Sequence, residues 1–174
     1  TVFYKPNRNA TTVGSEDKGT YNWDDRSGKN DKGGYGNRGE RYLACVAYLD
    51  GSDANPSAVF ARGYYTYAYL WAVDFDGKEI KDHWYHASYN KTQYKLTDAE
   101  GKTSTLPGKS PTRGSGNRTM YGNGNHNLSV GDVDGDGCDE IVWGSAALDH
   151  DGKLLYATGF GHGDAMHLAD HNPD

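Results

Sequence analysis

The feature that most constrains the fold is a series of short apolar and aromatic runs, each followed by a turn rich in Asp and Gly. The run 42–49 ends at Asp50-Gly51, for example, and the run 64–75 ends at Asp76-Gly77. Such runs, bounded by Gly and Asp, are typical of β-strands joined by hairpins. No segment shows the apolar period of about 3.6 residues that an amphipathic helix requires. The sequence therefore predicts an all-β chain, with strands at 42–49, 58–61, 64–75, 84–87, 128–130, 140–144, 146–148 and 154–158.

The composition excludes several classes of protein. The 174 residues suffice for one ordinary globular domain, although a hydrophobic share of 35% is low for a compact core. A net charge of -6 argues against a nucleic-acid partner, which would usually require a basic face. No apolar run of about 18 residues is present, so no membrane span is predicted. The two cysteines, Cys45 and Cys138, lack metal-type spacing and are expected to be free thiols.

The chain divides into a loop-rich arm, residues 1–40, and a β-region, residues 41–174, interrupted by a long insertion at about 88–122. The arm is rich in Gly, Asn, Asp and Lys. It begins without a signal-like segment, as expected of a mature form or an excised piece. The insertion is too long for a simple connection, which indicates a functional loop.

The β-region contains a repeat. The turn Asp149-His150-Asp151-Gly152-Lys153 matches Asp74-Phe75-Asp76-Gly77-Lys78, and each lies between two strand-like runs. A unit of strands joined by Asp-rich turns is typical of a four-stranded propeller blade. The chain holds about two such units and the start of a third, whereas a propeller closes with at least about four blades. We therefore expect part of a β-propeller whose remaining blades lie outside this chain.

The densest group of carboxylates is the loop that begins at Asp132. Acids at its first, third and fifth positions, a carbonyl at the seventh and an acid at the ninth form an oxygen shell of the kind that Ca2+ prefers. A helix–loop–helix calcium site would place its last acid at the twelfth position and a helix on each side. A solvated turn is the alternative, but carboxylates this close would repel one another without a cation. The predicted calcium ligands are Asp132, Asp134, Asp136, Cys138 (through its carbonyl) and Glu140.

Two histidines occupy equivalent places in successive units. His126 comes just before the strand that leads into the acidic loop, and His162, with Asp164 close behind, comes before the next unit. In a propeller, such segments lie near the central axis, where ligands usually bind. The three side chains therefore form a candidate site. The alternative is that both histidines cap turns through hydrogen bonds to the backbone.

Several motifs resemble the polysaccharide lyase family 11 rhamnogalacturonan lyases. The specific ones are His126-Asn127-Leu128-Ser129 and Gly161-His162-Gly163-Asp164-Ala165, which occur in the family's order. The resemblance runs from about residue 35 to the C-terminus, apart from the insertion, through the segments 35–38, 41–51, 61–66, 124–140 and 156–167.

The resemblance implies an eight-bladed, calcium-stabilised β-propeller that cleaves the rhamnosyl-(1→4)-galacturonate bond of rhamnogalacturonan I, a pectic polysaccharide. The implied reaction is β-elimination. A cation neutralises the galacturonate carboxylate, a base removes the C5 proton, and the bond to O4 breaks. A secreted or cell-surface location is expected for such an enzyme.

The resemblance also assigns roles to individual residues. His126, His162 and Asp164 are implied to hold or flank a catalytic calcium. Because calcium favours oxygen ligands, one imidazole could instead bind substrate or act as the base. Arg38 and Arg62 could pair with galacturonate carboxylates, or could be structural arginines stacked on tyrosines.

Two other functions fit the same sequence features. A non-catalytic propeller that binds carbohydrate or mediates adhesion would explain the calcium loop, but not the equivalent histidines. A lyase acting on another polyuronide, such as homogalacturonan, would use the same chemistry on a different substrate.

Overall fold

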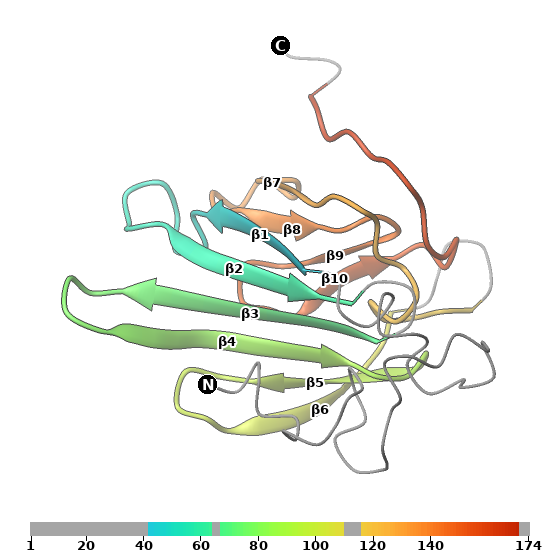
Figure 1. Ribbon diagram of the computed structural model, residues 1–174, viewed down its shortest axis with the longest axis horizontal. Helices are drawn as coiled ribbons and strands as arrows, with labels where there is room; N and C mark the ends of the chain where they lie inside the picture. The colour runs from blue at the N-terminus through green and yellow to red at the C-terminus, as the bar shows by residue number, and fades with distance from the viewer. Residues whose placement is uncertain (1–41, 64–66, 110–115, 171–174) are drawn as a thin grey trace, which may run out of the picture.

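The computed structural model describes residues 42–63, 67–109 and 116–170. These ranges contain ten β-strands in two antiparallel sheets and no helix (Figure 1). Among them, no helix is long and apolar enough to cross a membrane. The strands are β1 (Tyr42–Ala47), β2 (Ser57–Arg62), β3 (Ala68–Phe75), β4 (Ile80–Ser88), β5 (Gln93–Thr97), β6 (Thr103–Pro107), β7 (Ser129–Gly131), β8 (Glu140–Val142), β9 (Ala146–Leu148) and β10 (Leu154–Ala157).

Both sheets are simple meanders, in which each strand pairs with the next along the chain. The first sheet has the order β1-β2-β3-β4-β5-β6 and the second β10-β9-β8-β7. In the first sheet, Cys45 lies opposite Val59, and Trp71 lies opposite Tyr85. This topology follows from the short Asp-Gly turns, since tight hairpins join strands that are adjacent and antiparallel.

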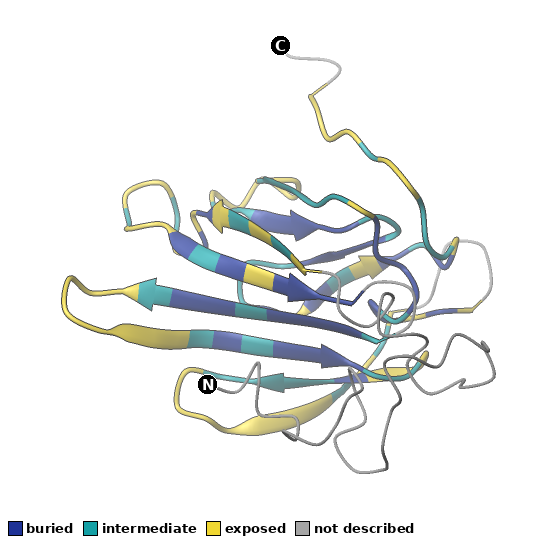
Figure 2. Cartoon of the chain, viewed as in Figure 1, coloured by how far each residue is buried: buried dark blue, intermediate teal, exposed yellow. Residues whose placement is uncertain are grey.

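The main core contains side chains from both sheets. Buried residues are concentrated in the central strands (Figure 2). Trp143, Leu70 and Leu148 are among the largest fully buried side chains, and they belong to one hydrophobic cluster. Strands β8 and β9 are buried along their whole length, and most of β3 is buried, so both faces of these strands are covered.

Hydrogen bonds also join the β9–β10 hairpin to the first sheet. Trp84 of β4 donates from its indole nitrogen to the carbonyl of His150 at 2.8 Å. The Leu154 amide donates to the Tyr94 hydroxyl at 3.1 Å. Gly152, at φ +78, lies so close to Trp84 that an added Cβ would be 2.6 Å from the indole. The turn therefore requires glycine both for its backbone conformation and for this approach.

The all-β prediction is confirmed for the described residues, and each of the eight predicted runs overlaps a strand, although β2, β4 and β7 extend beyond the predicted bounds. The cysteines are free thiols, as expected. Strands β5 and β6 were not predicted; they form a hairpin within the region assigned to the insertion. The arm, residues 1–40, lies outside the described residues, as does Arg38.

Candidate functional site

The predicted histidine site lies on two irregular segments that run in parallel. Asn125 and Gly163 form an isolated parallel β-bridge. The Gly163 amide donates to Oδ1 of Asn125 at 2.8 Å, and the Gly161 amide donates to Oδ1 of Asn123 at 3.1 Å. Both asparagine side chains are buried, so each carboxamide satisfies a backbone group that would otherwise lack a partner. These bonds align the two segments and bring residues 126 and 162 together.

The buried side chain of Asn125 packs against two positions where only glycine fits, Gly144 and Gly163. An added Cβ at Gly163 would be 2.7 Å from Oδ1 of Asn125, and one at Gly144 would be 2.6 Å from the same atom. The Trp143 indole donates to the backbone carbonyl of Asn125 at 2.8 Å. The segment bearing His126 is therefore fixed to the buried core.

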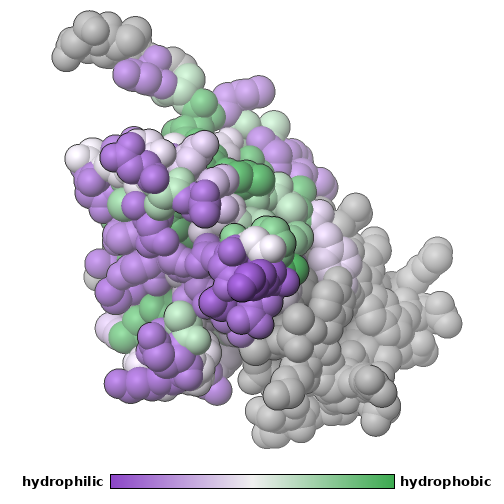
Figure 3. Space-filling model, turned by 90° about the vertical axis from the view of Figure 1, so that its left-hand side faces the viewer, coloured by the Kyte–Doolittle hydropathy of each residue, from purple (hydrophilic) through white to green (hydrophobic). Residues whose placement is uncertain are grey.

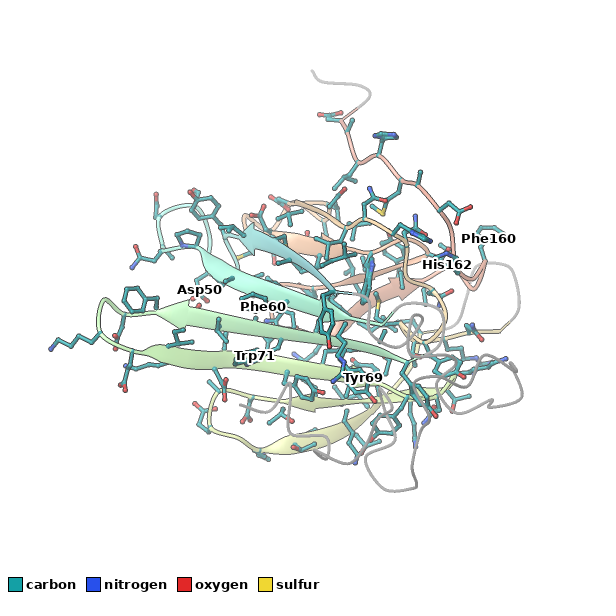
Figure 4. All side chains as sticks on the ribbon, in the orientation of Figure 1. Asp50, Phe60, Tyr69, Trp71, Phe160 and His162 are labelled. Atoms are coloured by element: carbon teal, nitrogen blue, oxygen red, sulfur yellow. The ribbon has the colours of Figure 1, made fainter. Side chains whose placement is uncertain are left out.

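The three predicted residues converge at this bridge. Nε2 of His126 and Nε2 of His162 each lie 3.5 Å from Oδ1 of Asp164. The two imidazole centroids are 5.0 Å apart. One donor atom from each of the three residues lies within 4.8 Å of the others, as required for ligands of one cation. Figure 4 shows His162 at the end of the molecule that lies on the right in this view.

A hydrogen bond from outside the cluster orients His162. Its Nδ1 lies 2.6 Å from the carbonyl of Gly124, which can only accept, so Nδ1 carries the proton and donates it. In the neutral ring, the lone pair is then on Nε2, on the side of Asp164. Metal-binding histidines usually have such a partner on their second nitrogen. The geometry suits cation binding, with two nitrogens and one oxygen as donors.

The acidic loop between β7 and β8 forms a second cluster. Carboxylate oxygens of Asp134, Asp136, Glu140 and Asp149 lie within 4.8 Å of one another. Three of these residues were predicted ligands. Asp149, from the β9–β10 turn, was not, although that turn belongs to the repeat found in the sequence. Asp132 accepts hydrogen bonds from the amides of Gly135 and Gly137, at 2.7 and 3.0 Å, and so closes the loop.

The surroundings of the Glu140 carboxylate suit a bound cation. Its side chain is fully buried, and the Val133 amide donates to Oε2 at 2.7 Å. Its Oε1 is buried without a hydrogen-bond partner in the described part of the chain. Burial, followed by the charges of Asp134 and Asp136, raises the pKa of Glu140. A hard cation would supply the missing partner and offset the repulsion among the carboxylates.

The other predicted site residues lie elsewhere. Cys138 was expected to contribute its carbonyl oxygen; its thiol lies within 4.8 Å of donor atoms of Asp136 and His150. Arg62 is buried at the end of β2, with its guanidinium carbon 5.8 Å from the centre of the Tyr42 ring. Such a contact is what a structural arginine stacked on tyrosine would make.

The two clusters flank opposite ends of β7. His126 precedes this strand, and the acidic loop follows it. Asp50 lies in the turn after β1, beside the acidic loop, and Figure 4 shows it far from His162. Figure 3 shows the end opposite His162, where hydrophilic residues cover much of the described surface. The described part of the molecule thus has one end rich in acidic turns and another that holds His126 and His162.

The two meander sheets and the two donor clusters define an all-β protein with candidate cation sites at either end. A model of the family "Rhamnogalacturonan lyase family 11, C-terminal domain" matches residues 11–107 and 109–174. The chain therefore belongs to rhamnogalacturonan lyase family 11.

Relatives from Bacillus subtilis (strain 168) agree with this assignment. The chain is 46% identical over 140 residues to the rhamnogalacturonan exolyase YesX, and 45% identical over 139 residues to the rhamnogalacturonan endolyase YesW. Both matches cover 80% of this chain, but only 19% and 18% of the relatives. The chain thus spans about a fifth of the length of these proteins.

Solved structures show the same relationship. The crystal structure of the exotype lyase YesX matches with a TM-score of 0.55 and 47% identity, over 77% of this chain and 18% of that one. The Bacillus licheniformis rhamnogalacturonan lyase matches with a TM-score of 0.56 and 45% identity, over 86% of this chain and 21% of that one.

Proposed function

We propose that this chain is part of a calcium-dependent rhamnogalacturonan lyase that cleaves the rhamnosyl-(1→4)-galacturonate bond of rhamnogalacturonan I by β-elimination. Family membership and the names of the relatives support the lyase class. The observation that carries the proposal is the convergence of His126, His162 and Asp164 on two hydrogen-bonded segments.

In the proposed mechanism, His162 and Asp164 would hold the cation. In the neutral ring of His162, the hydrogen bond from Nδ1 to the Gly124 carbonyl leaves the lone pair on Nε2, which would be the ligand atom. The rest of the longer protein and the substrate carboxylate would supply further oxygen ligands. Bound calcium would neutralise the galacturonate carboxylate and thereby make the C5 proton more acidic.

His126 is the proposed base. Its side chain is 40% exposed, against 18% for His162, so Nε2 of His126 has better access to a bound sugar. A neutral imidazole is a competent base near neutral pH. The C5 proton passes to Nε2, the C5–H electron pair forms the C4=C5 double bond, and O4 leaves with the electrons of the C4–O4 bond.

The acidic loop would hold a second calcium ion with a structural role. Such an ion would join the β7–β8 loop to the β9–β10 turn through Glu140 and Asp149. The β7–β10 sheet and strands β1–β4 of the six-stranded sheet would each form a blade of an eight-bladed propeller, completed by the rest of a longer protein. The four-stranded meander β7–β10 has the strand number of such a blade. For the whole protein we propose a secreted or cell-surface location, where it would meet pectic polysaccharide.

A chimera tests the proposal, because the chain covers about a fifth of its relatives. This chain would replace the matching segment of YesX, and ultraviolet absorbance would report new C4=C5 bonds. We expect a rise with rhamnogalacturonan I that requires calcium and is abolished by chelator. Removal of a key electrostatic group typically costs about 100-fold or more, and His162→Ala should lose at least that much activity. His83→Gln is the control, because His83 lies in β4 beside Asp50, at the end of the fold opposite His162.

Three outcomes would contradict parts of this proposal. Full activity of His162→Ala or Asp164→Asn would refute the site. Activity on homogalacturonan alone would retain the elimination chemistry and replace the substrate. An inactive chimera that still shows a calcium-dependent rise in melting temperature would favour the non-catalytic propeller.

A further inference from the structure

A third cluster of donor atoms lies beside the acidic loop, and it differs chemically from the other two. It combines a carboxylate, a thiol and an imidazole, from Asp136, Cys138 and His150. One donor atom from each lies within 4.8 Å of the others. Asp136 and Cys138 come from the β7–β8 loop and His150 from the β9–β10 turn, so the cluster joins two segments. Asp136 is exposed, and the other two residues are partly buried.

His150 is held in one orientation by a residue of a different segment. Its Nδ1 lies 3.0 Å from the carbonyl of Leu49, in the turn after β1, and must donate to it. In the neutral ring, Nε2 then bears the lone pair, and it lies 3.5 Å from Oδ2 of Asp136. Two acceptors that face each other repel unless a proton or a metal ion lies between them. A partner on the second nitrogen is also the usual arrangement for metal-binding histidines.

The donor types decide which cation fits. Ca2+ is a hard ion that prefers oxygen ligands, so the thiol of Cys138, which neither of the other two clusters contains, is a poor ligand for it. Zn2+ accepts thiolate, imidazole and carboxylate together, in tetrahedral sites that can leave one position for water. We propose that Asp136, Cys138 and His150 form a binding site for a thiophilic divalent cation of the Zn2+ type. On binding, the S–H bond of Cys138 breaks, its proton passes to solvent, and a metal–sulfur bond forms.

This site is independent of the proposed lyase function, but it is linked to the acidic cluster. Asp136 belongs to both groups, so its carboxylate lies between the calcium-type donors and the thiol. Two divalent ions that share one carboxylate repel each other. We therefore expect excess calcium to weaken the binding of Zn2+.

Cadmium is the sharpest probe, because thiolate ligation to Cd2+ produces a charge-transfer band in the ultraviolet. Titration of the chain with Cd2+ should give a band that saturates at one Cd2+ per chain, and calorimetry with Zn2+ should detect a site that is lost whenever the band is lost. Cys138→Ser should abolish the band. His150→Gln should weaken binding by more than about 100-fold, since even the outer-shell partners of metal ligands contribute about 10–100-fold.

The second thiol provides the matched control. Cys45 lies in β1, and no donor cluster of the described residues includes its thiol, so Cys45→Ser should keep the band. Circular dichroism would verify that each variant folds. The proposal is overturned if Cys138→Ser keeps the band, or if His150→Gln binds as the unmodified chain does. Absence of any band would show that the His150–Asp136 contact is a proton-mediated ion pair only.

Discussion

Lowering the pH should destabilise this chain through one fully buried histidine, His86. Its Nδ1 lies 2.9 Å from the carbonyl of Gly152, and its Nε2 lies 2.8 Å from the Ser88 hydroxyl. The ring stacks on Tyr94, with the centroids 4.5 Å apart. Burial lowers the pKa of His86 from 6.5 to about 4, although the hydrogen bond to Gly152 favours the charged form. The folded chain therefore keeps this imidazole neutral.

The sign and size of the effect follow from linkage. Because the pKa of His86 is lower in the folded state, the unfolded chain binds more protons between pH 6.5 and about 4. The stabilisation is complete above 6.5 and is lost as the pH falls to about 4. At about 1.4 kcal/mol per pH unit, this interval corresponds to about 3 kcal/mol. A typical domain has only about 5–15 kcal/mol of stability, so the loss should be easy to measure.

Urea unfolding, followed by circular dichroism at several pH values from 4 to 7.5, tests this reasoning. His86→Gln retains a donor and an acceptor but cannot titrate in this range. Its unfolding free energy should therefore fall less steeply with decreasing pH than that of the unmodified chain. Replacement of the exposed His167 by Gln is the control and should leave the slope unchanged. Equal slopes for His86→Gln and the unmodified chain would refute the argument.

Two further predictions concern stability. Glu140→Gln removes a buried charge from the acidic cluster, so calcium should raise the melting temperature of this variant less than that of the unmodified chain, whereas Asp53→Asn, in an exposed turn, should respond normally. An unchanged calcium response would exclude Glu140 as a ligand. Gly152→Ala should lower the unfolding free energy by about 1–3 kcal/mol more than Gly77→Ala. Both glycines have positive φ, but an added Cβ meets Trp84 at 2.6 Å only at Gly152 and nothing within 4 Å at Gly77. Equal losses in denaturant unfolding would show that Trp84 shifts at little cost.

Most of the fold could be predicted because its central strands are apolar or aromatic and end at Asp-Gly turns. The two missed strands, β5 and β6, are rich in Thr, Lys and Ser, and β6 is an edge strand with a largely exposed surface. Their alternation was still visible, since Tyr94 and Leu96 are two residues apart and both pack in the main core. A period of two residues, without a continuous apolar run, is thus the feature of the sequence that indicates these two strands.

The donor clusters were predictable only in part. Because His126 and His162 occupy equivalent positions in the repeat, the sequence predicts that they share a site. It does not show the Asn125–Gly163 bridge that aligns their two segments. Asp149 joins the acidic cluster from another hairpin, and such a contact depends on the packing of the two turns rather than on spacing within one loop. Sequence motifs identify the donors of one segment, whereas tertiary structure determines which segments share a site.

The two clusters lie at different ends of β7, so the proposed structural cation would be separate from the proposed catalytic one. Glu140 begins β8 and is fully buried, so a cation bound there would stabilise the junction of two hairpins. Asp164 is almost fully exposed, and its segment is held by asparagine carboxamides rather than by a sheet. A cation held at this end would have few ligands from this chain and would leave positions for a sugar carboxylate. Because β7 lies between the two ends, the loss of calcium from the acidic loop should lower the melting temperature without displacing His162, and substitutions at His162 should leave the melting temperature unchanged.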